Sequence, residues 1–206
     1  MNRYIPGDIY SNIEKLLKYR NINTNYKFLS IDNFAKEINH YGYIIIDGVN
    51  NKTNITTYII LFSPGSNYSL KSPDFSSLIK TKLQKNQLEN PTDILIISEL
   101  PLSNHIEKVL SGLREKYPKI FIENHSYNKF IIEIPKHVSV PKHEFATQDE
   151  VDNLLKNFYK NKLSFPKILQ SDSAVIWLGA RVGDIIKITR ISETAGTSIA
   201  YRIVTR

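Results

Sequence analysis

The sequence predicts two domains, an α/β domain with a mixed sheet over residues 1–135 and a small α+β domain over residues 136–206. Three observations lead to this fold class. Before residue 135, almost continuously apolar strand-type runs alternate with helical patterns, which is typical of a sheet covered on both faces. From Pro135 to Glu144 the chain carries two prolines and no helical period, which indicates an extended connector. Beyond the connector, helices precede a strand pair.

The elements of the N-terminal part follow from the periodicity of apolar residues. Residues 8–20 have apolar positions at helical spacing. Residues 30–41 begin with capping residues and end at Gly42, a residue suited to a left-handed helix end. Two β-rich runs, YIIIDGV and TTYIILF, are joined by Asp, Gly and Asn and predict an antiparallel hairpin. Further helices are expected over 74–87 and 103–116, and further strands over 93–98, 119–124 and 130–135.

The C-terminal part is expected to hold two helices and a hairpin. Thr147 and Glu150 have the spacing of a capping box, which predicts a helix from 147 to about 160. The residues expected to face a core on this helix are Leu154, Leu155 and Phe158. A short helix ended by Gly179 follows. Two β-rich runs, DIIKITRI and TSIAYRIV, then flank the polar stretch SETAG, whose glycine supplies a positive φ for the turn.

The composition limits the class of protein. With 41% hydrophobic residues, the 206-residue chain is long enough to bury a core. The beginning lacks the apolar segment of a signal peptide, and no apolar run approaches the about 18–20 residues of a membrane span. We therefore expect an intracellular protein without a membrane partner. The absence of cysteine excludes disulfides and thiol catalysis. The net charge of +7 raises the expectation of a nucleic-acid partner, although a lysine-rich solvated surface explains it equally well.

The sequence contains no recognisable catalytic apparatus. The five histidines include no helical zinc-site pair, and the glycine-rich phosphate and dinucleotide motifs are missing. A Mg²⁺-dependent nuclease often needs one acidic residue and then Asp/Glu-x-Lys on a neighbouring strand. Asp74, which follows a proline, offers the first part, but no Asp or Glu has a lysine two positions later. We therefore expect no catalytic residue, no metal, no cofactor and no nuclease activity.

The polar tip of the hairpin admits four interpretations: an active site, a ligand loop, a surface held by another protein, or a loop with nothing bound. Ser192 is not a credible nucleophile, because nothing near it in the sequence provides a base. From the pattern alone, the loop with nothing bound is favoured.

Four segments carry a resemblance to a known family: HVSVPKHE, TQDEVDNLLKNFY, LSFPKILQSDSA and GARVGDIIKITRISETAGTSIAYRIV. With them, the stretch from His137 to Arg206 resembles the assembly domain of the fifth subunit of eukaryotic-type DNA-directed RNA polymerases, a family that also has archaeal members. Residues 1–134 resemble the jaw domain of the eukaryotic members only in length and element order, and the archaeal members lack this domain.

The resemblance implies a non-catalytic polymerase subunit. In that family the C-terminal domain docks on the largest subunit. The jaw has a restriction-endonuclease-like fold without the active site, and it lies beside the downstream double-stranded DNA without reading its sequence. The missing Asp/Glu-x-Lys agrees with such a jaw.

The resemblance also assigns residues to sites. Those expected to form or brace the docking surface are Pro141, His143, Arg190, Ser192, Glu193, Thr194, Gly196, Tyr201 and Arg202. The expected DNA-proximal turn is Ser103, Asn104 and His105, although helix capping by Ser103 explains that segment equally well. Asp172-Ser173 stands where the family commonly has Asp-Pro, and Ile176-Trp177 replaces an arginine–aromatic pair.

Source, compartment and two other functions stay open. Heavy use of Asn, Lys, Ile and Tyr suggests an AT-rich genome, either of a large DNA virus encoding its own polymerase or of a cellular eukaryote. The protein would work in the nucleus if cellular, or in the host nucleus or cytoplasm and the virion if viral. The competing functions are a free-standing DNA-processing protein of nuclease ancestry and an adaptor that borrowed the assembly domain.

Overall fold

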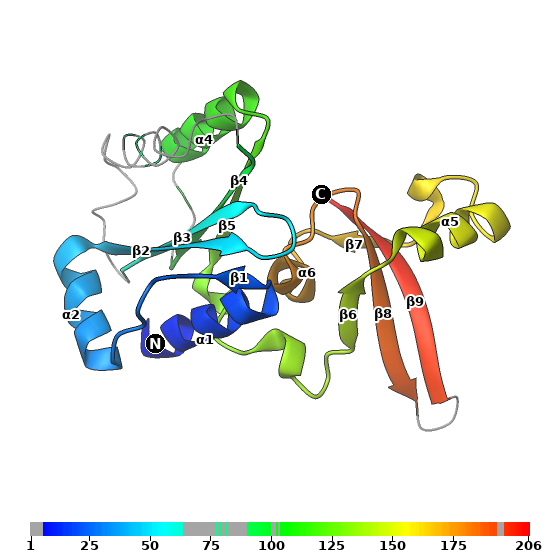
Figure 1. Ribbon diagram of the computed structural model, residues 1–206, viewed down its shortest axis with the longest axis horizontal. Helices are drawn as coiled ribbons and strands as arrows, with labels where there is room; N and C mark the ends of the chain where they lie inside the picture. Colours follow the sequence, from blue (N-terminus) through cyan, green and yellow to red (C-terminus); the bar gives the residue numbers. More distant parts are fainter. Residues whose placement is uncertain are drawn as a thin grey trace. The chain divides into compact units, whose positions relative to one another are not determined.

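The computed structural model describes residues 6–63, 90–99, 102, 104–192 and 196–206, together with positions 77, 79 and 81 (Figure 1). The chain divides into two compact units, residues 1–131 and residues 132–206. Each unit has a sheet and a buried core of its own. Most of the helix expected over 74–87 lies outside the described residues.

The N-terminal unit is built on a mixed sheet, as the sequence predicts. In the described part of this unit the strand order is β1-β2-β3-β4-β5. The pairs β1–β2 and β2–β3 are antiparallel, whereas β3–β4 and β4–β5 are parallel. The strands are β1 (Ile22–Asn23), β2 (Tyr43–Asn50), β3 (Thr56–Phe62), β4 (Thr92–Ser98) and β5 (Ile120–Ser126). The helices are α1 (Pro6–Tyr19), α2 (Ile31–Tyr41) and α4 (Asn104–Lys116).

Helices cover both faces of this sheet, because its central strands are apolar on both sides. Figure 1 shows α4 on one side and α1 and α2 on the other. Ile60 and Ile96 pack with Leu110 of α4 in one cluster. Their neighbours Ile59 and Ile97 alternate to the opposite side and are also buried.

The β2–β3 hairpin is confirmed, but its turn is shorter than predicted. The side chain of Asn50 accepts hydrogen bonds from the backbone N–H groups of Lys52 and Thr53 at 2.9 and 3.1 Å, and so builds the turn. The Asp-Gly pair expected in the turn lies within β2 instead. Gly48 is needed there because β1 passes close by: an added Cβ would lie 2.6 Å from the carbonyl oxygen of Asn23.

The prediction of a strand over residues 130–135 is wrong. Phe130 is fully buried, and the buried side chain of Asn12 donates to the carbonyl oxygens of Phe130 and Ile131 at 2.9 and 2.8 Å. Two short 3-10 helices, η1 (Tyr127–Lys129) and η2 (Ile134–Lys136), flank this bend. The segment therefore anchors to α1 instead of pairing with a neighbouring strand, although its residues have high β-propensity.

The C-terminal unit holds a second mixed sheet. In its described residues the strand order is β6-β8-β9-β7, antiparallel except for β7 with β9. The strands are β6 (Lys142–Phe145), β7 (Lys167–Leu169), β8 (Ile185–Ser192) and β9 (Gly196–Thr205). The helices are α5 (Gln148–Asn157), α6 (Ser173–Leu178) and the 3-10 helix η3 (Lys162–Ser164). The hairpin was predicted, whereas the two short edge strands β6 and β7 were not.

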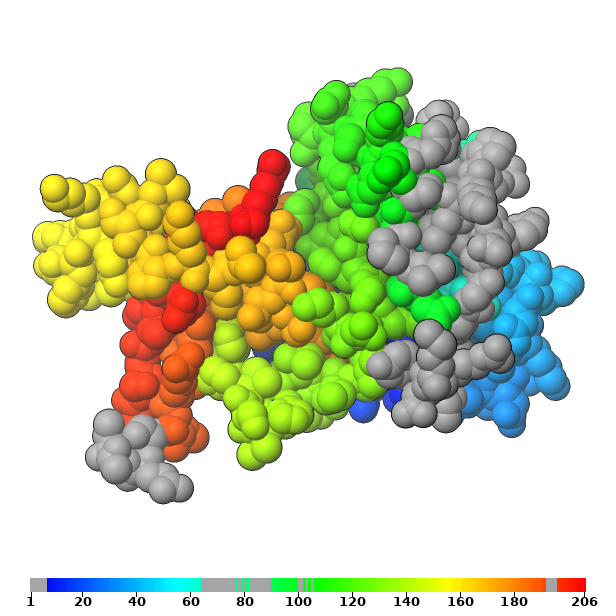
Figure 2. Space-filling model, turned by 180° about the vertical axis from the view of Figure 1, so that it is seen from behind, coloured from blue at the N-terminus to red at the C-terminus, as the bar shows by residue number. Residues whose placement is uncertain are grey.

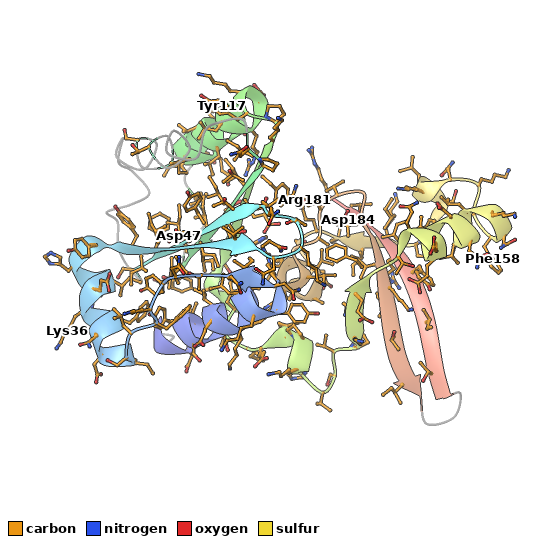
Figure 3. The ribbon with its side chains drawn as sticks, in the orientation of Figure 1. Lys36, Asp47, Tyr117, Phe158, Arg181 and Asp184 are labelled. Carbon is orange, nitrogen blue, oxygen red and sulfur yellow. The ribbon has the colours of Figure 1, made fainter. Side chains whose placement is uncertain are left out.

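The two α-helices of this unit pack on opposite faces of its sheet. Val175 of α6 packs with Ile186 and Ile188. On the other face, Val151 of α5 packs with Ile185 and Ile203, and Leu154 and Leu155 are partly buried there. Phe158 does not face this core: α5 ends before it, and the side chain is 75% exposed (Figure 3).

The short helix α6 is the most completely buried element of the unit. Its N-terminus is capped by the Asp172 side chain, which accepts from the backbone N–H of Ala174 at 2.8 Å. Gly179 ends it in the left-handed conformation, with φ of 74°, as predicted. The side chains of Ile176 and Trp177 are also buried.

Candidate docking surface

The β8–β9 hairpin extends beyond the helices that cover its base. Its ladder runs from Ile185↔Ile203 at the base to Ser192↔Gly196 at the tip. The outer half, residues 189–192 and 196–200, is called the hairpin arm here. Figures 1 and 2 show the arm running past α5. Along the hairpin, burial falls from the base to the tip, where Ile191 is 92% exposed.

The two faces of the arm differ in chemistry. Directly paired residues in an antiparallel ladder place their side chains on the same face. The pairs Thr189↔Ile199 and Ile191↔Thr197 give one face two isoleucines and two threonines. The pair Arg190↔Ser198 gives the other face a cation and a hydroxyl. Because Ile199 is 51% exposed, the apolar face of the arm has an uncovered surface of the kind that partners bind.

The base of the hairpin is attached to α5 through Glu150. The predicted capping box is present: Thr147 Oγ1 accepts from the backbone N–H of Glu150, and Glu150 Oε2 accepts from the backbone N–H of Thr147 at 2.9 Å. The other carboxylate oxygen, Oε1, accepts from Lys187 Nζ at 2.6 Å and from the Tyr201 hydroxyl at 3.1 Å. Lys187 and Tyr201 are directly paired on β8 and β9, so one carboxylate binds both strands.

These contacts shift the titration of the groups involved. The hydrogen bond from Lys187, followed by the one from the Thr147 backbone, lowers the pKa of Glu150 to about 2. The same bond with Glu150 raises the pKa of Lys187. Burial and the bond to Glu150 raise the pKa of Tyr201. Glu150 therefore stays ionised at neutral pH while both strands donate to it.

Two further contacts fix the ends of the hairpin strands. Arg202 Nη1 donates to the carbonyl oxygen of Lys167 at 2.9 Å, which ties β9 to β7. In the turn before β8, the backbone N–H of Arg181 donates to Asp184 Oδ2 at 2.7 Å (Figure 3). Gly183 supplies the positive φ of 96° that this turn needs. The GARVGD segment thus forms a turn that starts the hairpin.

The structure brings four residues of the predicted docking set around one hollow in the C-terminal unit: Pro141, His143, Arg190 and Arg202. Tyr201 lies on the opposite face and binds Glu150. Gly196 has the predicted positive φ, 70°. Glu193, Thr194 and the side chain of Ser192 lie outside the described residues.

The predicted DNA-proximal turn is described only in part. Asn104 is the first residue of α4 and is exposed. Ser103 and the side chain of His105 lie outside the described residues. A DNA contact at this helix N-terminus stays a prediction.

Sequence reasoning missed the exposure of the arm and the role of Lys187. Ile199, Tyr201 and Ile203 alternate along β9 and share one face, yet only the inner part of that face is covered. An alternation with period 2 identifies which residues share a face of a strand, but it does not show how much of that face a helix covers. Lys187 had no signal, because its partner Glu150 lies 37 residues away.

Comparison with known proteins places these features in a family. The family model described as RNA polymerase Rpb5, C-terminal domain, matches residues 132–204. Over 200 residues, 96% of both chains, the protein is 26% identical to the DNA-directed RNA polymerase RPB5 homolog of African swine fever virus. Over 73 residues, 35% of this chain and 94% of the relative, it is 45% identical to the DNA-directed RNA polymerase subunit Rpo5 of Methanococcus vannielii. The Rpo5 subunit of Methanocaldococcus jannaschii is 40% identical over 73 residues.

These matches define the class of the protein as a subunit of a multisubunit RNA polymerase. The viral relative matches across both units, as expected for a virus-encoded form of the subunit. The archaeal relatives match over about a third of the chain. The chain belongs to the Rpb5 family of RNA polymerase subunits. Within the described residues, no helix is long and apolar enough to cross a membrane.

Replacing Glu150 by glutamine tests the link between α5 and the hairpin. The pKa of about 2 in the folded protein lies below the unfolded value of about 4.3, so ionised Glu150 contributes stability above that value. This contribution is lost as the pH falls towards 2. Glutamine can still complete the capping box but loses the ion pair with Lys187, so we expect Glu150→Gln to lower the free energy of unfolding of the C-terminal unit by about 1 kcal/mol at pH 7. The difference from the original protein should shrink between about pH 4.5 and pH 2.

The measurement is urea denaturation followed by the fluorescence of Trp177, the only tryptophan, which is buried in the C-terminal unit. Asp152→Asn is the matched control, because Asp152 lies on the same helix in an exposed position and accepts a hydrogen bond from the Gln148 side chain at 2.7 Å. A Glu150→Gln deficit as large at pH 2.5 as at pH 7 would contradict the assignment.

Proposed function

We propose that this protein is a non-catalytic subunit of a multisubunit DNA-directed RNA polymerase, and that its C-terminal unit docks on the largest subunit. The observation that carries the proposal is the match to a viral RPB5 homolog over 96% of both chains. Two archaeal Rpo5 relatives also match, over 73 residues each, and the family model for the Rpb5 C-terminal domain matches residues 132–204. The catalytic groups belong to other subunits, and the role of this chain is assembly and positioning.

The hairpin arm is the proposed contact region. Its uncovered isoleucines supply apolar area. Removing this area from water under a partner is favourable by a free energy of about 25 cal/mol per Å². Its base is held by Glu150 and Arg202, so the arm loses little conformational freedom on binding. The predicted docking residues therefore divide into two groups. Arg190 and the tip contact the partner, whereas Tyr201 and Arg202 brace the hairpin.

The N-terminal unit is the proposed jaw, with a restriction-endonuclease-like fold that has lost its active site. Its mixed sheet, covered on both faces, and the missing Asp/Glu-x-Lys support this assignment.

We propose that the N-terminal unit lies beside the downstream duplex. The exposed lysines 108, 116 and 119, on α4 and directly after it, provide sequence-independent charge for phosphates. Such a contact weakens as the salt concentration rises. The site of action is the nucleus, or the host cell and virion for a viral enzyme.

Replacing Ile191 by aspartate tests the docking assignment. A charge buried against an apolar partner surface carries a desolvation cost, so we expect retention of the full chain on the immobilised largest subunit to fall at least tenfold. Phe158→Asp is the control, because it introduces the same charge at an exposed aromatic residue of the same unit. Its affinity should stay within twofold. Unchanged Trp177 fluorescence verifies folding of both variants. Equal losses in the two variants, or none in Ile191→Asp, would overturn the assignment to the arm.

Incubation with plasmid DNA separates the proposal from a free-standing nuclease. The purified chain with Mg²⁺ or Mn²⁺ should leave supercoiled plasmid intact, because the acidic pair and lysine that hold a metal and position water are incomplete. Gel electrophoresis is the readout. Protein-dependent cleavage that disappears in Asp74→Ala would establish the nuclease instead.

A further inference from the structure

The chain between α5 and β7 forms a surface that the docking proposal does not use. Residues 156–167, called the lysine–aromatic segment here, run from the last turn of α5 through η3 to the first residue of β7. The longer stretch 153–171 contains no Asp or Glu. The segment carries four lysines, all of them exposed: Lys156, Lys160, Lys162 and Lys167. It is therefore a positively charged surface of the C-terminal unit.

These charges lack partners within the described part of the chain. There, none of the four lysines forms an ion pair or donates a side-chain hydrogen bond. Lys156 lies in the last turn of α5, where its charge offsets the partial negative charge of the helix end. Lys160, Lys162 and Lys167 lie beyond the helix and have no such role. Three exposed cations are therefore available to a ligand.

An aromatic ring stands among these lysines without a packing role. Phe158 is 75% exposed at the end of α5, and among the described residues its ring stacks on no other ring (Figure 3). The neighbouring ring of Tyr159 packs instead on buried Phe165, with ring centroids 4.1 Å apart. Asn161 Oδ1 accepts from the backbone N–H of Ser164 at 3.1 Å and builds the turn that follows. These contacts hold the backbone in place while the Phe158 ring stays in solvent.

The combination of lysines and a free ring favours one class of ligand. Lysines attract phosphates without reading sequence, and an unpaired nucleobase stacks on an exposed aromatic ring. A duplex keeps its base faces stacked inside, so it can use the lysines but not Phe158. A carboxylate is matched best by arginine, whose fork donates two parallel hydrogen bonds, and the segment contains no arginine. The ligand that uses both parts of this surface is a single-stranded nucleic acid.

We propose that the lysine–aromatic segment binds single-stranded nucleic acid, with one base stacked on Phe158 and the neighbouring phosphates bound by the lysines. Stacking and phosphate contacts are common to RNA and DNA strands, so both should bind. In an RNA polymerase, the released product is such a strand. The inference goes beyond the proposed assembly role, and the binding itself does not depend on docking to the largest subunit.

The first test concerns the ring. The fluorescence anisotropy of a labelled oligouridine of about 12 nucleotides measures its affinity for the full chain. We expect Phe158→Leu to weaken binding at least about fivefold, because leucine stays apolar but offers no stacking face. Phe158→Trp should bind at least as tightly as the original chain. Tyr41→Ala, which removes another exposed aromatic side chain, should leave the affinity unchanged. Unchanged Trp177 fluorescence verifies folding of the leucine variant.

The second test concerns the lysines. For single strands, the slope of log K against log salt changes by about 0.7 for each phosphate that a cation neutralises. We therefore expect Lys160→Ala and Lys162→Ala each to reduce the magnitude of this slope by about 0.7. Lys36→Ala is the control, because Lys36 is exposed on α2 in the other unit, and it should leave the slope unchanged (Figure 3).

Competition experiments identify the class of ligand. Unlabelled oligothymidine should displace the labelled strand, whereas a DNA duplex of the same length and polyglutamate should do so much less well. Equal displacement by the duplex would show that the bases are not stacked, and equal displacement by polyglutamate would assign the segment to an acidic polypeptide. Either result overturns the inference, as does undiminished binding of oligouridine by Phe158→Leu. Retention on the largest subunit should be the same for Phe158→Leu as for the original chain, so failure of this inference leaves the proposed function standing.

Discussion

One carboxylate, that of Glu150, sets the geometry on which the C-terminal unit depends. Its Oε2 completes the capping box that starts α5, and its Oε1 accepts from Lys187 and Tyr201 on the two central strands. A helix start leaves backbone N–H groups without intrahelical partners, and a hairpin needs an external contact to fix its orientation. Glu150 meets both needs at once. A neutral capping residue would satisfy only the start of the helix, whereas the charged carboxylate also binds the two hairpin strands.

This attachment explains how an exposed arm remains suited to binding. The inner hairpin is covered by α5 on one face and α6 on the other, with Ile185 and Ile186 alternating between the two cores. Arg202 adds a bond to the edge strand β7. The outer hairpin is uncovered, yet its direction is determined by a fixed base. Preorganisation of this kind reduces the entropy lost on association.

Much of the fold was predictable because its signals are local. The capping box, the ends of α2 and α6 at Gly42 and Gly179, and the β2–β3 hairpin depend on residues close together in the sequence. The predictions failed where contacts between residues far apart in the sequence determine the local structure. The β-rich segment after Phe130 bends because Asn12 binds its carbonyl groups, and the short strands β6 and β7 exist because the hairpin offers them edges.

The candidate site, likewise, was predictable as a set of residues but not as a surface. Resemblance selected Arg190, Tyr201 and Arg202 together, whereas the ladder register separates Tyr201 onto the α5 side. A one-residue offset reverses the face of a strand residue, so the division between bracing and contacting residues requires the register.

The central claim is that this chain is a constitutive subunit and not a transient adaptor. Native mass spectrometry of the polymerase, purified through a tag on its largest subunit and washed at high salt, tests this claim directly. We predict one copy of the 206-residue chain for each largest subunit, retained after the wash. A purified, active polymerase that lacks the chain, or that carries it in a small fraction of complexes, would contradict the claim.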